Sequence, residues 1–243
     1  MTTKSPVAII TGASSELGKP QPSYLLSTTT SCPCLAGDLT QDCITATIGD
    51  LREDSIAKDL IKHTMDKFGQ IDVLVNNAGI LVNGTVEESP VTDYDRVFDV
   101  NVRTVIQLTK HAIPHLIASK GSIVNVSSVA GTCAFPGVTY YCMSKAALDQ
   151  FTKCLSLELA AKGVRVNAVN PGVILSNIHR RSGMSEEAYE EFIKKGETTH
   201  ALGRVGTPDE VASGIYFLAS KDSSFTTGHL LSIDGGRNIM SPR

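Results

Sequence analysis

The sequence predicts an α/β protein with a doubly wound parallel sheet between two layers of helices. Short apolar runs alternate along the chain with longer amphipathic stretches, which is the pattern of repeated β-α-β units. Polar and apolar residues hardly alternate within the runs, as expected for parallel strands covered on both faces. No internal repeat or linker interrupts the 243 residues, so we predict a single three-layer α/β/α domain over residues 1–243.

Six apolar runs are predicted to form the strands of this sheet. Each has four to six residues, a usual strand length, and each is followed by turn residues or a helical stretch. In chain order the predicted strands are Val7–Ile10, Ile44–Ile48, Asp72–Val75, Ile123–Val126, Val164–Val169 and Leu230–Ile233.

Helical stretches lie between these runs. Three of them are predicted at Glu53–Phe68, Val91 to about Ala118, and Gly137–Ala161. In the third, apolar residues recur every four positions from Ala147 to Leu159, which indicates one buried face. A fourth helix begins after Thr207, where Pro208 takes the first helical position and Glu210 completes a capping box.

Composition excludes several classes of function. The net charge of −3 without a basic cluster disfavours nucleic acid and anionic membrane surfaces as partners. The apolar runs are too short to span a bilayer. Met1–Pro6 lacks the apolar core of a secretory signal, and Ser241–Arg243 matches no peroxisomal or prenylation signal. We therefore expect a cytoplasmic protein.

Six cysteines are spread along the chain, and in the cytoplasm we expect them to be free thiols. Cys32, Cys34 and Cys43 are close enough in sequence to raise the question of a zinc site. However, Cys32 and Cys34 lack the usual two-residue spacer, and no histidine lies nearby. We predict no metal site.

A turn of small residues, Thr11–Gly18, directly follows the first predicted strand. Small residues at such a turn let backbone amides approach a pyrophosphate at the N-terminus of the next helix. A glycine turn alone is a weak indication, because many are only tight turns. Its place after a strand at the start of the chain favours nucleotide binding.

Tyr141 and Lys145 are four residues apart in a predicted helix, and Ser128 precedes the tyrosine by thirteen residues. Residues at this i,i+4 spacing share a helix face. A lysine ammonium beside a tyrosine favours the phenolate, so we predict that Lys145 lowers the pKa of Tyr141. Tyr141 can then act as a general acid or base, while the Ser128 hydroxyl holds the reacting oxygen. Taken alone, a Tyr/Lys pair is more often an ordinary surface pair.

Together, these motifs resemble those of the short-chain dehydrogenase/reductase family. The resemblance covers the first eighteen residues and the chain from about Ile44 to the end. The matching positions are Thr11–Gly18, Asn76–Gly79, Asn101, Ser128, Tyr141, Lys145, Pro171–Gly172 and Asp234–Gly236. The motifs are specific in combination, and they imply a Rossmann-like fold. Within this family, the sequence most resembles the branch of the 3-oxoacyl-carrier-protein reductases.

The resemblance implies four catalytic residues in a hydride transfer between nicotinamide and a carbonyl or secondary alcohol. Tyr141 would exchange the proton with the substrate oxygen, and Ser128 would hydrogen-bond that oxygen. Lys145 would lower the pKa of Tyr141 and bind the nicotinamide ribose. Asn101 would position a water between Lys145 and solvent; alternatively, it is a structural asparagine that bends its helix. The neighbouring Ser127 and Tyr140 are out of register.

The resemblance also implies NADP or NAD as the cofactor, with NADP slightly preferred. The partners would be a small carbonyl or alcohol substrate and further copies of the chain, in a homodimer or homotetramer formed through the two long helices. The predicted cofactor-binding residues are Thr11, Gly12, Ser14, Leu17, Gly18, Asp50, Leu51, Asn77, Ala78, Gly79, Tyr141, Lys145, Pro171, Gly172, Ile174 and Ser176.

Two features depart from the family pattern. Glu16 stands where the second glycine of the turn is expected, and its charge beside two phosphates would cost about 1 kcal/mol or more if the loop keeps its usual path. Only 25 residues, 19–43, separate Gly18 from the Ile44 strand, whereas a helix, a strand and a second helix need roughly 40. We predict that this region is shortened, with Tyr24–Thr30 as a replacement strand.

Two aspartates are candidates for the adenine end of the site. Asp50 follows the better predicted strand and leaves room for one helix before the next strand, so we favour it. Asp38 lies 20 residues after Gly18, where a ribose-binding acid is expected, but a plain turn aspartate is the simpler interpretation.

Residues Leu175–Val205 are predicted to form a lid over the substrate. Met184, Tyr189 and Phe192 suit an apolar substrate or the packing of the lid itself, and His200 is expected to be a satisfied or exposed histidine. Ketones, aldehydes, steroids, sugars and acyl thioesters all fit. Besides an active enzyme, the two departures leave open a catalytically silent protein of the same fold and a chain that folds poorly.

Overall fold

The computed structural model describes residues 6–12, 24–30 and 44–240, and of residues 24–30 and Ile44 it describes the backbone only. The strands are β1 Val7–Thr11, β2 Tyr24–Thr30, β3 Ile44–Gly49, β4 Val73–Asn76, β5 Ser122–Val126, β6 Arg165–Pro171 and β7 Leu230–Ile233. The helices are α1 Asp54–Phe68, α2 Val91–Phe98, α3 Thr104–Ser119, α4 Thr139–Ala160, α5 Ile178–Arg181, α6 Glu186–Thr199 and α7 Pro208–Ala219. Shorter helical segments are η2 Asp99–Arg103, η3 Val129–Gly131, η4 Lys221–Ser223 and η5 Arg237–Ile239.

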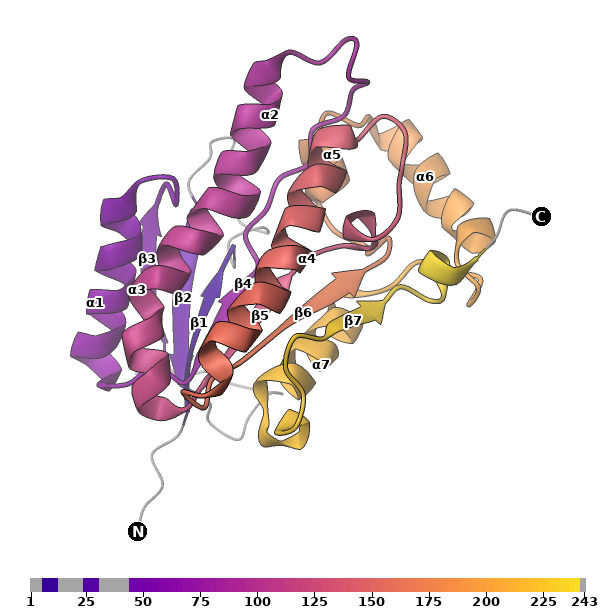
Figure 1. Cartoon of the computed structure of the whole chain (residues 1–243). Coiled ribbons are helices and arrows are strands. Elements are labelled where there is room, and N and C mark those ends of the chain that lie inside the picture. Colours follow the sequence, from indigo (N-terminus) through magenta and orange to yellow (C-terminus); the bar gives the residue numbers. More distant parts are fainter. Residues whose placement is uncertain (1–5, 13–23, 31–43, 241–243) are drawn as a thin grey trace.

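All seven strands belong to one sheet with the order β3-β2-β1-β4-β5-β6-β7 (Figure 1). From β1 to β7 along this order, each strand is parallel to its neighbour. Strands β1 to β3 extend toward one edge of the sheet and β4 to β7 toward the other, so the strand order reverses between the neighbours β1 and β4. In open α/β sheets, ligands bind at such a reversal point, outside the carboxyl ends of the strands. The predicted doubly wound, Rossmann-like class is confirmed.

Strand β2 has the bounds predicted for the replacement strand, but it runs antiparallel to both β1 and β3. A parallel neighbour requires a crossover of a dozen or more residues, usually with a helix, whereas an antiparallel neighbour requires only a turn. The short stretch between Thr11 and the Ile44 strand therefore accommodates a strand without two full crossovers. The sheet is mixed at this position, although the sequence predicted it to be parallel throughout.

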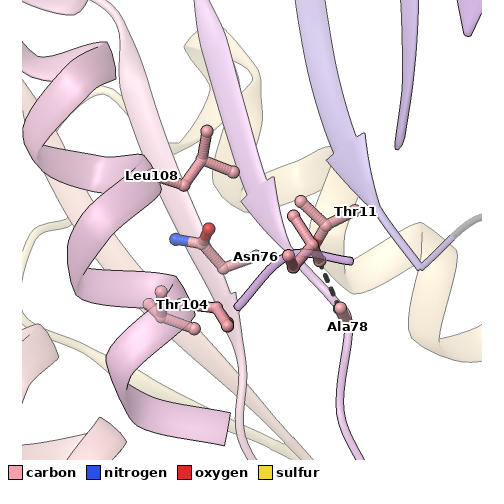
Figure 2. Close-up of a pocket in the computed structure, with 7 residues that line it drawn as sticks. Thr11, Asn76, Ala78, Thr104 and Leu108 are labelled. Carbon is pink, nitrogen blue, oxygen red and sulfur yellow. Dashed lines mark hydrogen bonds between the residues drawn. The ribbon is translucent and has the colours of Figure 1, made fainter. Parts of the chain in front are cut away.

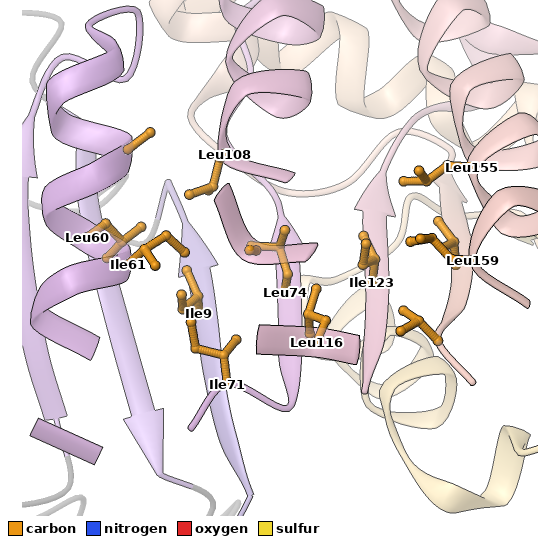
Figure 3. Packing of buried hydrophobic residues seen from close by; sticks show 14 of the residues in the cluster. Ile9, Leu60, Ile61, Ile71, Leu74, Leu108, Leu116, Ile123, Leu155 and Leu159 are labelled. Atoms are coloured by element: carbon orange, nitrogen blue, oxygen red, sulfur yellow. The ribbon is translucent and has the colours of Figure 1, made fainter. Parts of the chain in front are cut away.

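The main core lies between the sheet and helices α1, α3 and α4, which cover one face (Figures 1 and 3). Ile9 of β1 and Leu74 of β4 are fully buried there, and Leu60 of α1 and Leu116 of α3 pack against the same face. A second cluster packs α7 on the opposite face. Each fully buried leucine or isoleucine contributes about 1.5–3 kcal/mol, so this packing fixes the carboxyl ends of β1 and β4 in place.

The predicted helices are present, with one interruption. The helix predicted from Val91 to about Ala118 is divided into α2 and α3 by the π-helical segment η2. Such π-turns occur often at functional sites, and this one contains Asn101. Thr207 and Glu210 form the predicted capping box at the start of α7.

The predicted lid region contains α5 and α6, which lie beyond one end of the sheet (Figure 1). Within the described part of the chain, no helix has the length and apolar character needed to cross a bilayer. Cys133, Cys142 and Cys154 are free thiols, as predicted.

Candidate active site

The carboxyl ends of β1 and β4 are joined through the side chain of Thr11. Its Oγ1 accepts hydrogen bonds from the backbone amides of Asn77 and Ala78, both at 2.9 Å, and its carbonyl accepts one from Asn77 Nδ2 at 2.9 Å. Figure 2 shows Thr11, Asn76 and Ala78 beside a small recess under the start of α3, lined also by Thr104 and Leu108. The structure thus brings the predicted residues Thr11, Asn77 and Ala78 together.

Gly12 directly follows Thr11, and its backbone has φ +73°, a conformation that residues other than glycine rarely adopt. A Cβ atom added there would lie 2.9 Å from Ala78 Cα and 3.1 Å from the Ala78 amide nitrogen. Backbone cannot move aside as a side chain does, so both the conformation and the close approach to β4 require glycine.

We expect Gly12→Ala to destabilise the protein by about 2–4 kcal/mol, since left-handed strain of about 1–2 kcal/mol adds to a backbone clash. The matched control is Gly203→Ala, because Gly203 has φ +70° and nothing within 4 Å of an added Cβ. Urea denaturation of both variants separates conformational strain from the clash. Equal losses in the two variants would contradict a steric role for Gly12.

Asn76 is the last residue of β4 and Asn77 follows it, and the two asparagines have separate environments. Asn77 belongs to the turn just described, whereas Asn76 is buried and donates from Nδ2 to Asn125 Oδ1 at 2.8 Å. Asn125 in turn donates to Thr152 Oγ1 of α4 at 2.8 Å. Asn76 is therefore a structural residue that connects β4 through β5 to α4 and satisfies buried polar groups.

Asn101 is buried in η2, and its amide is fully used by neighbouring groups. Oδ1 accepts from the Ile80 amide at 2.9 Å, while Nδ2 donates to the Ile80 carbonyl at 2.9 Å and to Ser144 Oγ at 3.0 Å. This arrangement agrees with the structural interpretation of a helix-bending asparagine. A Cβ added to Gly79 would lie 3.4 Å from Asn101 Oδ1 and 3.6 Å from Lys145 Nζ, so both side chains reach the loop after β4.

Ser128, Tyr141 and Lys145 converge at the carboxyl edge of the sheet. Ser128 ends the loop after β5, and its side chain acts on the Tyr141 phenol in the direction that lowers the pKa of the phenol. Lys145 lies one turn beyond the tyrosine on α4, with Nζ 5.6 Å from the centre of the tyrosine ring and 2.8 Å from the Val126 carbonyl. The neighbours Ser127 and Tyr140 point elsewhere, Ser127 Oγ to the Lys145 carbonyl and Tyr140 OH to the Ser89 carbonyl.

Burial dominates the charge state of the pair. It raises the pKa of Tyr141 to about 12, although the Ser128 hydrogen bond works in the opposite direction. Burial likewise lowers the pKa of Lys145 to about 8. The predicted lowering of the Tyr141 pKa by Lys145 is therefore wrong, because the loss of water around the phenol has the largest effect and Lys145 is not among the groups that shift this pKa.

The surroundings of Tyr141 are apolar. Leu81, Ala130 and Tyr141 form a buried cluster, against which Phe135, Val138, Cys142 and Ile178 pack. Ile178 belongs to α5, so the predicted lid region contributes to the wall around the tyrosine. An apolar wall with a few convergent polar groups is the usual composition of a small-molecule site.

Asp50 and Leu51 are less available than predicted. The Asp50 carboxylate is held by Arg52, whose Nε lies 3.0 Å and 2.9 Å from its two oxygens, and this hydrogen bonding lowers the pKa of Asp50. Leu51 is buried in the main core. Leu51 also lines the recess beside Thr11.

The loop after β6 is held from two sides. The Gly172 amide donates to the Ile233 carbonyl at 3.0 Å, and a Cβ at Gly172 would lie 3.0 Å from Asp234 Cα and from His200 Nε2. Ile174 packs into the core under α7, whereas Ser176 is exposed. Of the predicted residues here, Pro171 and Gly172 are therefore better placed to line a site than Ile174.

His200 is buried and satisfied, which agrees with the expectation for it. Nε2 accepts from the Val173 amide at 3.2 Å, so Nδ1 carries the proton and donates to the Gly196 carbonyl at 3.0 Å. Burial lowers the pKa of His200, which keeps it in this neutral form. No sequence pattern indicated that His200 connects the end of α6 to the loop after β6.

Several predictions concern residues outside the described ranges. These residues are Ser14, Glu16, Leu17, Gly18, Asp38 and the cysteines at 32, 34 and 43. Among the residues that are described, no group of three or more His, Cys, Asp or Glu could hold a metal ion. The expectations for the phosphate turn and for the absence of zinc at these cysteines stay predictions.

A doubly wound sheet with convergent polar groups at the carboxyl edge of its strands is the architecture of nucleotide-binding α/β enzymes. A family model described as Enoyl-(Acyl carrier protein) reductase matches residues 32–238. The 3-oxoacyl-[acyl-carrier-protein] reductase FabG of Thermotoga maritima is 36% identical over 252 aligned residues, covering 97% of this chain and 99% of its own. The meso-2,3-butanediol dehydrogenase of Serratia marcescens is 37% identical over 187 residues, covering 77% and 72%.

Solved structures agree with these matches. A Caenorhabditis elegans short-chain dehydrogenase/reductase of unknown function, solved with cofactor, is 37% identical and superimposes with a TM-score of 0.76 over 80% of this chain and 75% of its own. ElxO with NADP bound is 36% identical, with a TM-score of 0.73 over 79% and 77%. The chain belongs to the short-chain dehydrogenase/reductase family, and it is an oxidoreductase that depends on a nicotinamide cofactor.

Proposed function

We propose that the protein reduces a small apolar carbonyl compound with NADPH or NADH, and oxidises the matching secondary alcohol in the reverse direction. The observation that carries this proposal is the placement of Ser128, Tyr141 and Lys145 against one apolar wall at the carboxyl edge of the sheet. The cofactor supplies or accepts the hydride when it is bound. The chain itself must then hold the substrate oxygen and move one proton.

Tyr141 is the proton donor in this proposal. A phenol with a pKa of about 12 is protonated at neutral pH, which is the form that carbonyl reduction requires. Ser128 supports the same oxygen in this proposal, since its side chain already acts on the pKa of the phenol. Lys145, with a pKa of about 8, is mostly charged at pH 7 and stabilises the phenolate that the transfer leaves.

The nicotinamide end of the site suits the cofactor. Gly12 and Gly79 bring bare backbone to the edge of the sheet, and Lys145 Nζ and Asn101 Oδ1 lie close to Gly79. We infer that Lys145 binds the ribose hydroxyls there and that Pro171 and Gly172 border the nicotinamide. Asp50 fits the adenine end less well, because Arg52 occupies its carboxylate. A slight preference for NADP is supported only by relatives such as ElxO with NADP bound.

We infer the substrate class from the side chains that surround Tyr141. Phe135, Val138 and Ile178 present apolar groups, which favours an apolar ketone, although the guanidinium of Arg237 lies 5.0 Å from the centre of the Phe135 ring. The relative named 3-oxoacyl-[acyl-carrier-protein] reductase makes a 3-oxoacyl thioester the first compound to assay. We also infer a cytoplasmic location and a homodimer or homotetramer; Leu157, 79% exposed on α4, is consistent with contact between copies.

A catalytically silent protein of the same fold is the second candidate, favoured by Glu16 and by the short, reversed β2 region. A titration with NADPH and then NADH, followed by nicotinamide fluorescence and by thermal shift, distinguishes the two. We expect saturable binding in the micromolar range and a rise in the melting temperature, since a ligand that binds only the folded state stabilises it. Absence of binding at millimolar cofactor, with a cooperative thermal transition, would establish the silent protein instead.

A further inference from the structure

Asp149 is a buried carboxylate one helical turn after Lys145 on α4. Asn170, the residue before Pro171 on β6, donates from Nδ2 to both carboxylate oxygens at 3.1 Å. The same Nδ2 donates to the Ser128 carbonyl at 2.9 Å. One amide therefore joins α4, the loop that carries Ser128, and the end of β6.

Steric contact holds the same three elements together. A Cβ added to Gly131 would lie 2.2 Å from Asp149 Oδ2 and 3.0 Å from the Lys145 carbonyl carbon, so the turn after Ser128 rests directly on α4 at Asp149. Within that turn, the Ala130 amide donates to Ser128 Oγ at 3.1 Å and the Gly131 amide donates to the Ser128 carbonyl at 2.9 Å. The orientation of the Asn170 amide is fixed, because its reverse would place an oxygen against three acceptors.

We propose that Asp149, held by Asn170, is a positioning residue that fixes the Ser128 turn against α4 and whose negative charge acts on the Lys145 ammonium. This proposal rests on the proposed function, in which Ser128 and Lys145 serve Tyr141. The Ser128 hydroxyl and the Tyr141 phenol lie on different elements, and Asp149 and Asn170 connect those elements. A displacement of about 1 Å between such groups can reduce turnover by about a hundredfold.

The charge of Asp149 opposes the effect of burial on Lys145. Burial lowers the pKa of Lys145, and the Asp149 carboxylate raises it again. Burial raises the pKa of Asp149 itself, whereas hydrogen bonds from Ser127 and Asn170 and the charges of Lys145 and Lys153, both on α4, favour its carboxylate form. Removal of the carboxylate should therefore lower the pKa of Lys145 further.

The experiment compares Asp149→Asn with Asp149→Ala, and uses Glu158→Gln as the control because Glu158 is an exposed acid on the same helix. Asparagine keeps an acceptor for Asn170 but removes the charge. In Asp149→Asn we expect the alkaline limb of the kcat profile for carbonyl reduction to move about one unit toward lower pH, with cofactor affinity changed less than threefold. In Asp149→Ala we expect kcat to fall about tenfold to a hundredfold.

Hydrogen exchange provides a readout that needs no turnover. Amides of residues 130–133 should exchange about tenfold faster in Asp149→Ala and in Asn170→Ala, and at the wild-type rate in Asp149→Asn and Glu158→Gln. A wild-type pH profile in Asp149→Asn would overturn the action on Lys145, and unchanged exchange in both alanine variants would overturn the positioning. If the wild type binds no cofactor, the proposed function fails while the exchange data still decide the positioning.

Discussion

Tyr141→Phe is expected to lower kcat for carbonyl reduction by about 10²–10⁴, the range that a positioned general acid contributes. The change removes one oxygen from a buried side chain and leaves the ring in the apolar cluster with Leu81 and Ala130. The fold and the affinity for NADPH should therefore change little, within about threefold. Steady-state kinetics with a 3-oxoacyl thioester, together with cofactor titration, measure both quantities.

Tyr140→Phe is the matched control for this experiment. The Tyr140 hydroxyl lies 3.4 Å from the Ser89 carbonyl, and its ring packs edge-on against Tyr94 with centroids 5.8 Å apart. Its phenol therefore has no part in the site, and the variant should keep wild-type turnover. If Tyr141→Phe also retained wild-type turnover, another group would be the proton donor.

Lys145→Met is expected to abolish most turnover and yet to stabilise the protein at neutral pH. The ammonium is buried, and the difference between its pKa of about 8 when folded and the ordinary 10.5 corresponds to an energy of the order of 3 kcal/mol, at about 1.4 kcal/mol per pKa unit. The net gain will be smaller, because Asp149 loses a neighbouring positive charge in the variant. The loss in kcat should be about a hundredfold or more.

The pH dependence of stability tests the same point. Between pH 8 and 10.5 the unfolded wild type binds more protons than the folded form, since its lysine is still protonated, so the free energy of unfolding rises with pH in this window. Lys145→Met lacks this rise. Urea denaturation at pH 7 and pH 9.5 should show the two proteins converging in stability at the higher pH. A wild type with no such rise would mean that the ammonium is solvated in the folded protein.

Strand and helix positions were predictable because apolar runs and four-residue periods depend on short segments. The capping box of Thr207 and Glu210 was found in the same way. The direction of β2 was not predictable, because strand direction depends on which neighbours are available and not on the residues within the strand. For Asn101 the sequence left a helix-bending asparagine open as an alternative, but it did not predict the π-turn, which depends on contacts with Ile80 and Ser144, far along the chain.

In the candidate site, too, features that depend on nearby residues were predictable and features that depend on the folded chain were not. Spacing along one helix and one loop indicated Ser128, Tyr141 and Lys145, and the resemblance of the surrounding motifs to the family favoured them over an ordinary surface pair. The pKa of Tyr141 was predicted in the wrong direction, since the sequence shows neighbouring charges but does not show how completely water is excluded. Asp149 and Asn170 were overlooked because they are 21 positions apart and meet only in the folded chain.

The reversal of β2 changes where its ends lie relative to the site. Tyr24 pairs with Gly49 at the carboxyl edge of β3, and Thr30 pairs with Val7 at the opposite edge of β1. The chain therefore enters β2 beside the cofactor edge and leaves it on the far side of the sheet. In an ordinary doubly wound protein, the acid that reads the ribose follows this strand. Because the end of β2 lies at the opposite edge here, attempts to switch coenzyme preference should target Asp50, which directly follows β3 at the edge of the candidate site.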